Sequence, residues 1–96
     1  MKQWFVYILA NGMNGTLYVG VTNNLTQRIS EHKTAAIQSF TQKYAIHDLV
    51  YYETLDSPED AIRREKNIKA WQRLWKLRLI NETNPEWKDL SDSLLD

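Results

Sequence analysis

The sequence contains no cysteine, only three glycines and two prolines, and no net charge among its 96 residues. The lack of cysteine excludes disulfide bonds, thiolate metal ligands and a thiol nucleophile. No apolar run approaches the ~18–20 residues that span a bilayer, and the N-terminus has no apolar segment of a secretory signal. We therefore expect a soluble, cytoplasmic protein that does not bind membranes. At this length the chain can form only one hydrophobic core.

The 12 basic and 12 acidic residues are unevenly distributed. Segment 63–78 is basic except for Glu65, whereas segment 82–96 is acidic, so we divide the chain into a domain, residues 1–83, and an acidic C-terminal tail, residues 84–96. A basic segment of this density suits nucleic acid, although its Lys and Arg stems could equally cover apolar surface on a solvated helix face. The opposite charges predict that the tail docks on the basic segment. The basic residues are Arg63, Arg64, Lys66, Lys69, Arg73, Lys76 and Arg78.

The hydrophobic pattern predicts a three-stranded, antiparallel-type sheet flanked by helices. Two strand-length runs of β-branched and aromatic residues surround a loop with two Asn-Gly pairs, which indicates an antiparallel hairpin. Asn24 and Ser57 are good residues to begin helices. The element order is β-β-α-β-α-α, which is an α+β fold. The expected strands are 4–9, 17–21 and 49–54, and the expected helices are 24–33 and 57–81, the second with a break near Ala70-Trp71.

Strand alternation places two tyrosines beside a glycine. If the aliphatic residues of the hairpin pack together, Tyr7 and Tyr18 share the opposite face, next to the gap left by Gly20. Two phenols beside a glycine can shape a site, but ordinary cross-strand aromatic packing would explain the same pattern.

Three other polar residues border or enter the apolar faces of the predicted helices. Arg28 and His32 are four residues apart, so they share a helix face that borders the apolar stripe. An arginine can bind a phosphate and a histidine can carry a proton near neutral pH, although such a pair is often a plain surface feature. Glu65 falls in the middle of an apolar arc, where a carboxylate must be paired or must bind a cation. Glu65 is therefore either a functional group or the ion-pair partner of Lys69.

These residue types could together hydrolyse a phosphodiester. One carboxylate, with waters and a phosphate, is a common way to hold Mg²⁺ in phosphoryl-transfer sites. An arginine beside the phosphate and a phenol or imidazole that handles protons would complete such a site. The spacing alone does not decide whether the residues converge.

The ordered set of motifs resembles the GIY-YIG nuclease superfamily, and in particular its small, stand-alone, single-domain bacterial members. The resemblance begins with Val6-Tyr7-Ile8 and with Tyr18-Val19-Gly20, eleven residues further on, and it covers roughly residues 4 to 80. The other matching segments are Asn24–Arg28, His32, Phe40–Tyr44, Leu49–Glu53, Ala61–Lys66 and Trp71, and the tail is similar over Asn84–Leu90.

The resemblance implies an endonuclease that hydrolyses DNA phosphodiester bonds with a single Mg²⁺ (or Mn²⁺) ion. Glu65 would be the metal ligand. Tyr7 and Tyr18 would shape the catalytic site, and one of them would activate the attacking water. Arg28 would hold the scissile phosphate, and His32 would assist proton transfer.

The same resemblance places Lys43 and Tyr44 along the DNA-binding cleft. The basic segment would add sequence-independent phosphate contacts. Because 96 residues leave no room for a separate recognition domain, a structural feature of the DNA or a partner protein would supply specificity. Val21 stands where several families have a lysine, so one cation near the phosphate is missing. The basic residues expected to contact DNA are Arg63, Lys66, Lys69 and Arg73.

Two other interpretations remain open. The chain could be a nucleic-acid-binding or interaction module that keeps the fold with little or no cleavage activity, or a structural protein in which Glu65 is merely salt-bridged. The presence of Tyr7, Tyr18, Arg28 and Glu65 together favours the enzyme, since a binding module would need none of them.

Overall fold

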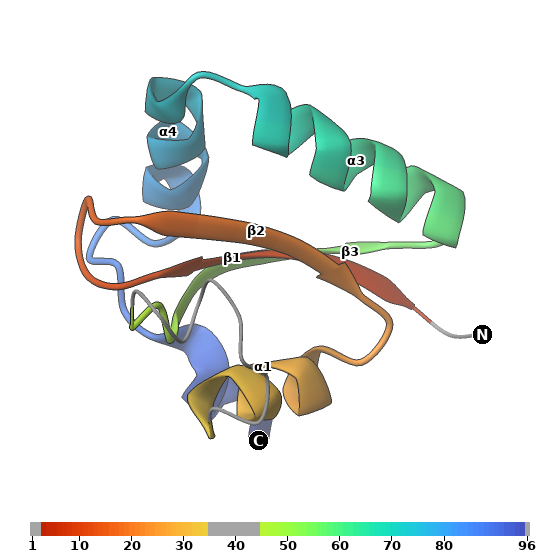
Figure 1. Ribbon diagram of the computed structural model, residues 1–96, viewed down its shortest axis with the longest axis horizontal. Helices are drawn as coiled ribbons and strands as arrows, with labels where there is room; N and C mark the ends of the chain where they lie inside the picture. The colour runs from red at the N-terminus through yellow and green to blue at the C-terminus, as the bar shows by residue number, and fades with distance from the viewer. Residues whose placement is uncertain (1–2, 35–44, 96) are drawn as a thin grey trace.

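The computed structural model describes residues 3–34 and 45–95, which form an antiparallel three-stranded sheet with helices on both faces (Figure 1). The element order is β-β-α-β-α-α followed by a short 3-10 helix, so the α+β prediction is confirmed. The strand order is β2-β1-β3, which places β1 in the centre and β2 at an edge. No helix among the described residues is long and apolar enough to span a membrane. The strands are β1 (Trp4–Ala10), β2 (Leu17–Thr22) and β3 (Asp48–Leu55), and the helices are α1 (Leu25–Lys33), α3 (Pro58–Ala70), α4 (Arg73–Thr83) and the 3-10 helix η1 (Leu90–Leu95).

The register of the hairpin assigns each side chain to one of the two faces of the sheet. Each face has its own cluster of buried residues, so the single core expected from the chain length is divided in two by the sheet. Tyr7 is opposite Gly20 and Ile8 is opposite Val19, so the tyrosine and the isoleucine point to different faces. The aliphatic face packs against α3 and α4, and the face with Tyr7 packs against α1, as Figure 1 shows in edge view. The first core includes Val6, Ile8, Val19, Ala61, Ile68 and Ile80, and the second includes Tyr7, Leu9, Leu25, Ile29 and Leu49.

The helices begin where the sequence predicts. The side-chain oxygen of Asn24 accepts a hydrogen bond from the backbone N–H of Gln27 (3.1 Å), and the two side chains are bonded to each other (3.1 Å). Ser57 Oγ likewise accepts from the N–H of Asp60 (3.2 Å), with Pro58 as the first helical residue of α3. Each cap satisfies an N–H that the first helical turn leaves unpaired.

The predicted break in the long helical segment is also present. Trp71 and Gln72 have extended backbone conformations, with ψ of 153° and 149°, so α3 ends at Ala70 and α4 begins at Arg73. The two helices therefore lie at an angle over the same face of the sheet (Figure 1).

Asn84 joins the end of α4 to an irregularity in β3. The register of β1 and β3 shifts so that Val50 has no opposite residue on β1, which is the pattern of a β-bulge. Asn84 Nδ2 donates to the carbonyl oxygens of Val50 (3.1 Å) and Lys88 (2.8 Å), and its Oδ1 accepts from the N–H of Lys88 (3.0 Å). The buried amide thus replaces partners that the bulge and the chain reversal remove.

The described part of the tail, residues 84–95, does not dock on the basic segment, so the prediction made from the opposite charges is wrong. Asp89 Oδ2 is 2.6 Å from Lys33 Nζ at the end of α1, and its Oδ1 accepts from the N–H of Leu49 (3.1 Å). The 3-10 helix η1 then packs against β3 and α1. The tail therefore lies largely on the α1 side of the sheet, away from α3.

Candidate active site

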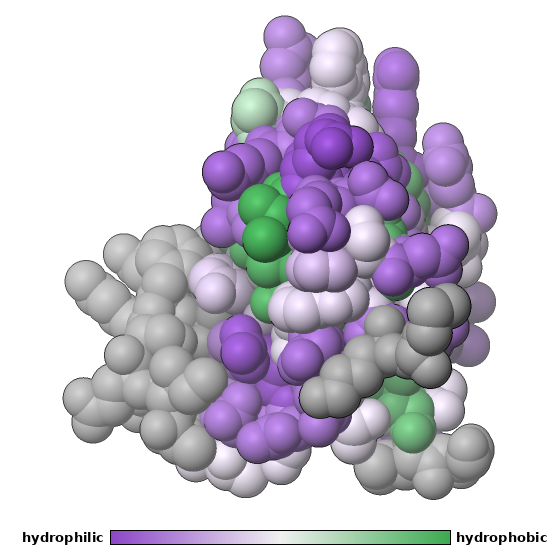
Figure 2. All heavy atoms as spheres, turned by 90° about the vertical axis from the view of Figure 1, so that its right-hand side faces the viewer, coloured by the Kyte–Doolittle hydropathy of each residue, from purple (hydrophilic) through white to green (hydrophobic). Residues whose placement is uncertain are grey.

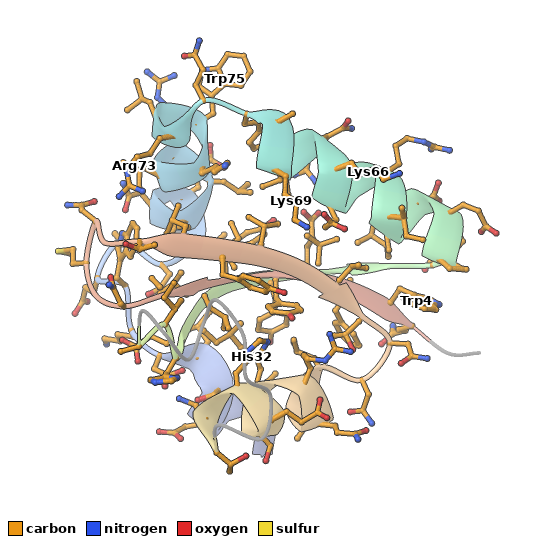
Figure 3. All side chains as sticks on the ribbon, viewed as in Figure 1. Trp4, His32, Lys66, Lys69, Arg73 and Trp75 are labelled. Carbon is orange, nitrogen blue, oxygen red and sulfur yellow. The ribbon has the colours of Figure 1, made fainter. Side chains whose placement is uncertain are left out.

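Three rings from three different elements meet between the sheet and α1. Tyr7, on the central strand, is fully buried, and its Oη is 3.2 Å from His32 Nε2 on α1. The Tyr18 ring, on the edge strand, lies 6.3 Å from the Tyr7 ring and packs edge-on against His32 at 5.5 Å. Figure 3 shows His32 pointing from α1 towards the sheet. The structure thus brings together three of the predicted catalytic residues.

The glycine beside this cluster does not leave an open gap. A Cβ atom at Gly20 would lie 2.4 Å from Tyr7 Cζ and 2.5 Å from Tyr7 Oη, so the tyrosine ring itself occupies the space. The absence of a side chain on β2 is therefore what allows the Tyr7 hydroxyl to reach His32.

The surroundings of the cluster keep both hydrogen-bonded groups neutral. Burial, and then the neighbouring Tyr18, raise the pKa of Tyr7 to about 12, although Arg28 opposes the shift. Burial, and then the positive charge of Arg28, lower the pKa of His32 below its ordinary value of 6.5. At pH 7 a neutral imidazole therefore faces a protonated phenol, and one ring nitrogen of His32 can accept a proton.

Arg28 lies at the accessible rim of the cluster. Its side chain is 38% exposed, and its Nε is 3.3 Å from a carboxylate oxygen of Glu31 on the same helix. An exposed ion pair of this kind contributes little to stability, because water screens both charges. The guanidinium can therefore exchange Glu31 for a phosphate at small cost.

Glu65 lies on the other side of the sheet. It is buried on α3, as its place in the apolar arc predicts, and its Oε1 is 2.7 Å from Lys69 Nζ. The ion pair that the sequence left as an alternative is therefore present, and Figure 3 shows Lys69 between α3 and β2. Helix α3 packs across β1 and the edge strand β2. The Glu65 carboxylate and the ring cluster therefore lie on opposite faces of the sheet, at the side of the sheet that β2 forms.

One carboxylate is enough for the kind of metal that the sequence suggests. Among residues 3–34 and 45–95, no group of three or more His, Asp or Glu side chains could enclose a metal ion. Mg²⁺ does not need such a group, because it keeps several waters and is commonly held by one or two carboxylates and by substrate phosphates. Glu65 fits this role as a hard oxygen donor, and Lys69 competes with a cation for the same oxygen.

The other residues expected to contact DNA are in varied settings. Arg63 and Lys66 are exposed on α3, and Arg63 is 3.2 Å from Asp60. Polar side chains cover most of the end of the molecule where α3 begins (Figure 2). Lys43 and Tyr44 lie outside the described residues.

Arg73 has a structural partner. Its Nη2 donates to the carbonyl oxygens of Asn14 and Gly15, both at 2.6 Å, and so ties the start of α4 to the β1–β2 loop. Its charge still adds to the basic surface, but the guanidinium is partly occupied. The sequence analysis gave no role to Trp71, which it noted only as a family match, and it did not single out Trp75. The available signal was the four-residue spacing of the two tryptophans within the basic segment.

Comparisons with known proteins identify the family of the chain and support its fold. Residues 3–78 match the model of the GIY-YIG catalytic domain. The chain is 37% identical over 82 residues to a UPF0213 protein of Staphylococcus haemolyticus and 33% identical over 82 residues to one of Staphylococcus saprophyticus; each alignment covers 85% of this chain and 99% of the relative. The solution NMR structure of the UPF0213 protein BH0048 from Bacillus halodurans is similar with a TM-score of 0.57 and 26% identity, over 91% of this chain and 92% of that one.

Proposed function

The chain belongs to the GIY-YIG family, and from this premise we propose that it is a metal-dependent endonuclease that hydrolyses phosphodiester bonds of DNA. The observation that carries the proposal is the ring cluster. A phenol bonded to a neutral histidine, with a second phenol and an arginine beside them, is an arrangement suited to moving a proton next to a phosphate.

Exposure separates the roles of the two tyrosines. Tyr7 and His32 are buried, whereas Tyr18 and Arg28 are partly exposed, so the second pair can touch a substrate. We assign Tyr18 Oη to the attacking water, which it would bind and orient. Tyr7 would be a positioning residue, because its hydrogen bond fixes the His32 ring against which Tyr18 packs.

Arg28 would bind the scissile phosphate. Its fixed positive charge and several N–H donors match phosphate oxygens, and the charge that develops during the attack would strengthen those bonds. The pair with Glu31 holds the guanidinium at the rim before the phosphate arrives.

Glu65 would hold the divalent ion. A bound Mg²⁺ or Mn²⁺ would supply positive charge beside the phosphate and lower the pKa of a coordinated water. Lys69 must release Oε1 of Glu65 for this, which costs little because the lysine is 55% exposed and can be solvated.

The same ion pair favours a second candidate function. A carboxylate that is already neutralised by Lys69 has less need of a cation. The chain would then be a nucleic-acid-binding or interaction module that keeps the fold with little or no cleavage.

A cleavage assay separates the two functions. Wild type, Glu65→Gln and the matched control Glu59→Gln, which removes an exposed acid from the same helix, are incubated with plasmid, branched and single-stranded DNA in Mg²⁺, Mn²⁺ or EDTA. We expect metal-dependent nicking by wild type and by the control, reduced by about 100-fold or more in Glu65→Gln. Circular dichroism verifies that each variant is folded. DNA binding without nicking by all three folded proteins would instead support the binding module.

A further inference from the structure

Helix α4 presents apolar side chains to solvent as well as to the core. Leu74 and Trp75, in its first turn, are 54% and 49% exposed, while Ile80 on the inner side is fully buried. A surface helix normally keeps its outer face polar. Two large, adjacent apolar side chains on an outer face are typical of a binding surface.

The exposed tryptophan belongs to an ordered aromatic group. The rings of Trp71 and Trp75 pack edge to face, 6.1 Å apart at 74°. The guanidinium of Arg64 lies 5.2 Å from the Trp71 ring and is itself held by Glu53 at 2.7 Å. Figure 3 shows Trp75 next to the α3–α4 junction, pointing away from the sheet. We call Trp71, Trp75, Arg78 and Leu79, which line a shallow hollow together with Glu82, the tryptophan platform.

The charge around the platform indicates what it binds. It lies at the end of the basic segment, and Glu82 is the single acid in its lining. A polyanion that also offers flat apolar faces matches both properties. An unpaired nucleic-acid strand has such faces, whereas a duplex keeps its base faces stacked within the helix.

We propose that the tryptophan platform stacks the bases of an unpaired strand while Arg78 contacts its backbone. This inference rests on the proposed nucleic-acid substrate and narrows its class to DNA with an unpaired segment. The platform is on the face of the sheet that carries α3, so the strand it holds would run along the basic helix that contains Glu65.

Binding measured in EDTA tests the platform without cleavage. Fluorescence anisotropy compares a labelled oligothymidine with a hairpin duplex for wild type, Trp75→Leu and Ile62→Ala. The last is the matched control, because Ile62 is also exposed (42%) and lies on α3 directly before the basic segment, but outside the platform. We expect Trp75→Leu to weaken single-strand binding by about 10-fold or more and duplex binding much less, with no change for Ile62→Ala.

The salt dependence separates stacking from charge. Arg78→Gln should lower the slope of log affinity against log salt by about 0.7 on the single strand, whereas Trp75→Leu should leave that slope unchanged. Oligothymidine should also quench the tryptophan fluorescence of wild type more than that of Trp75→Leu.

Several results would overturn the proposal. Equal losses on single strand and duplex in Trp75→Leu would mean that the face contacts backbone and not bases. Unchanged DNA binding, with a dimer in sedimentation that Trp75→Leu abolishes, would make the face an interface between copies of the chain. Absence of DNA binding at low salt would also reject it. Platform binding without metal-dependent nicking would support this inference while rejecting the endonuclease.

Discussion

Replacing Gly20 by alanine should disrupt the ring cluster from the neighbouring strand. The new Cβ would lie 2.4 Å from Tyr7 Cζ and 2.9 Å from Cε1, distances that real Cβ atoms essentially never show. Something must move by about an ångström to reach ordinary contact. The Tyr7 ring has no free space to enter, because it is fully buried on the central strand and hydrogen-bonded to His32.

The cost follows from two effects. Inserting extra atoms into a densely packed core typically lowers the free energy of unfolding by about 1–3 kcal/mol. Loss of the buried bond between Tyr7 and His32 adds about 1 kcal/mol. We therefore expect Gly20→Ala to lower the free energy of unfolding by about 2–4 kcal/mol, which for a domain of this size lowers Tm by roughly 10 °C or more.

A double-mutant cycle tests the cause of the loss. Urea unfolding is followed by circular dichroism for wild type, Gly20→Ala, Tyr7→Leu and the double variant. Leucine ends short of the Cζ and Oη positions, so in that background Gly20→Ala should cost at least about 1 kcal/mol less. Additive costs would refute the clash, and would mean that Gly20 matters through strand backbone alone.

Two further changes test the attachment of the tail. Asn84→Ala should cost about 2–3 kcal/mol in urea unfolding, because the buried Val50 carbonyl loses its partner; a loss below about 1 kcal/mol would mean that water replaces the amide. Burial by itself raises the pKa of Asp89, but hydrogen bonds from Lys33, Ser91 and Leu49 outweigh this effect and hold the pKa below its ordinary value of 3.8. The stability that this carboxylate contributes is therefore present at neutral pH and is lost as the pH falls through its lowered pKa. Asp89→Asn should be less stable than wild type at pH 7, with a gap that narrows below about pH 4, as urea midpoints at several pH values would show. A gap independent of pH would contradict the ionic role.

Patterns with a fixed period carried much of the prediction. In a hairpin, a one-residue slip would exchange the two faces of a strand and mix the aliphatic set with the aromatic one, so alternation was enough to place Tyr7 and Tyr18 on one side. The helical period likewise predicted the burial of Glu65. Neither pattern could predict that the Tyr7 ring fills the space over Gly20, since that depends on packing between strands.

The opposite charges of the two segments were a poorer guide to where the tail docks. The acidic tail and the basic segment carry opposite charges, but salt largely screens the attraction between exposed charges that are more than about 10 Å apart. Asp89 instead makes short bonds to Lys33 and to the N–H of Leu49, which single charges in a sequence do not reveal. Local hydrogen-bonding geometry therefore decided the path of the tail.

The division of the candidate site between two faces limits where a substrate could bind. The ring cluster lies on the face of the sheet that packs against α1, and Glu65 lies on the face that packs against α3. A phosphate bound in the middle of either face could therefore reach only one of the two. Strand β2 pairs with β1 alone among the described strands, which leaves its outer side as the line where both faces meet. If the proposed endonuclease is correct, the scissile phosphate must therefore lie along β2, between Arg28 and Glu65. A bulky substitution at a partly exposed position of that strand, such as Val21, should then impair cleavage while leaving binding to the tryptophan platform intact.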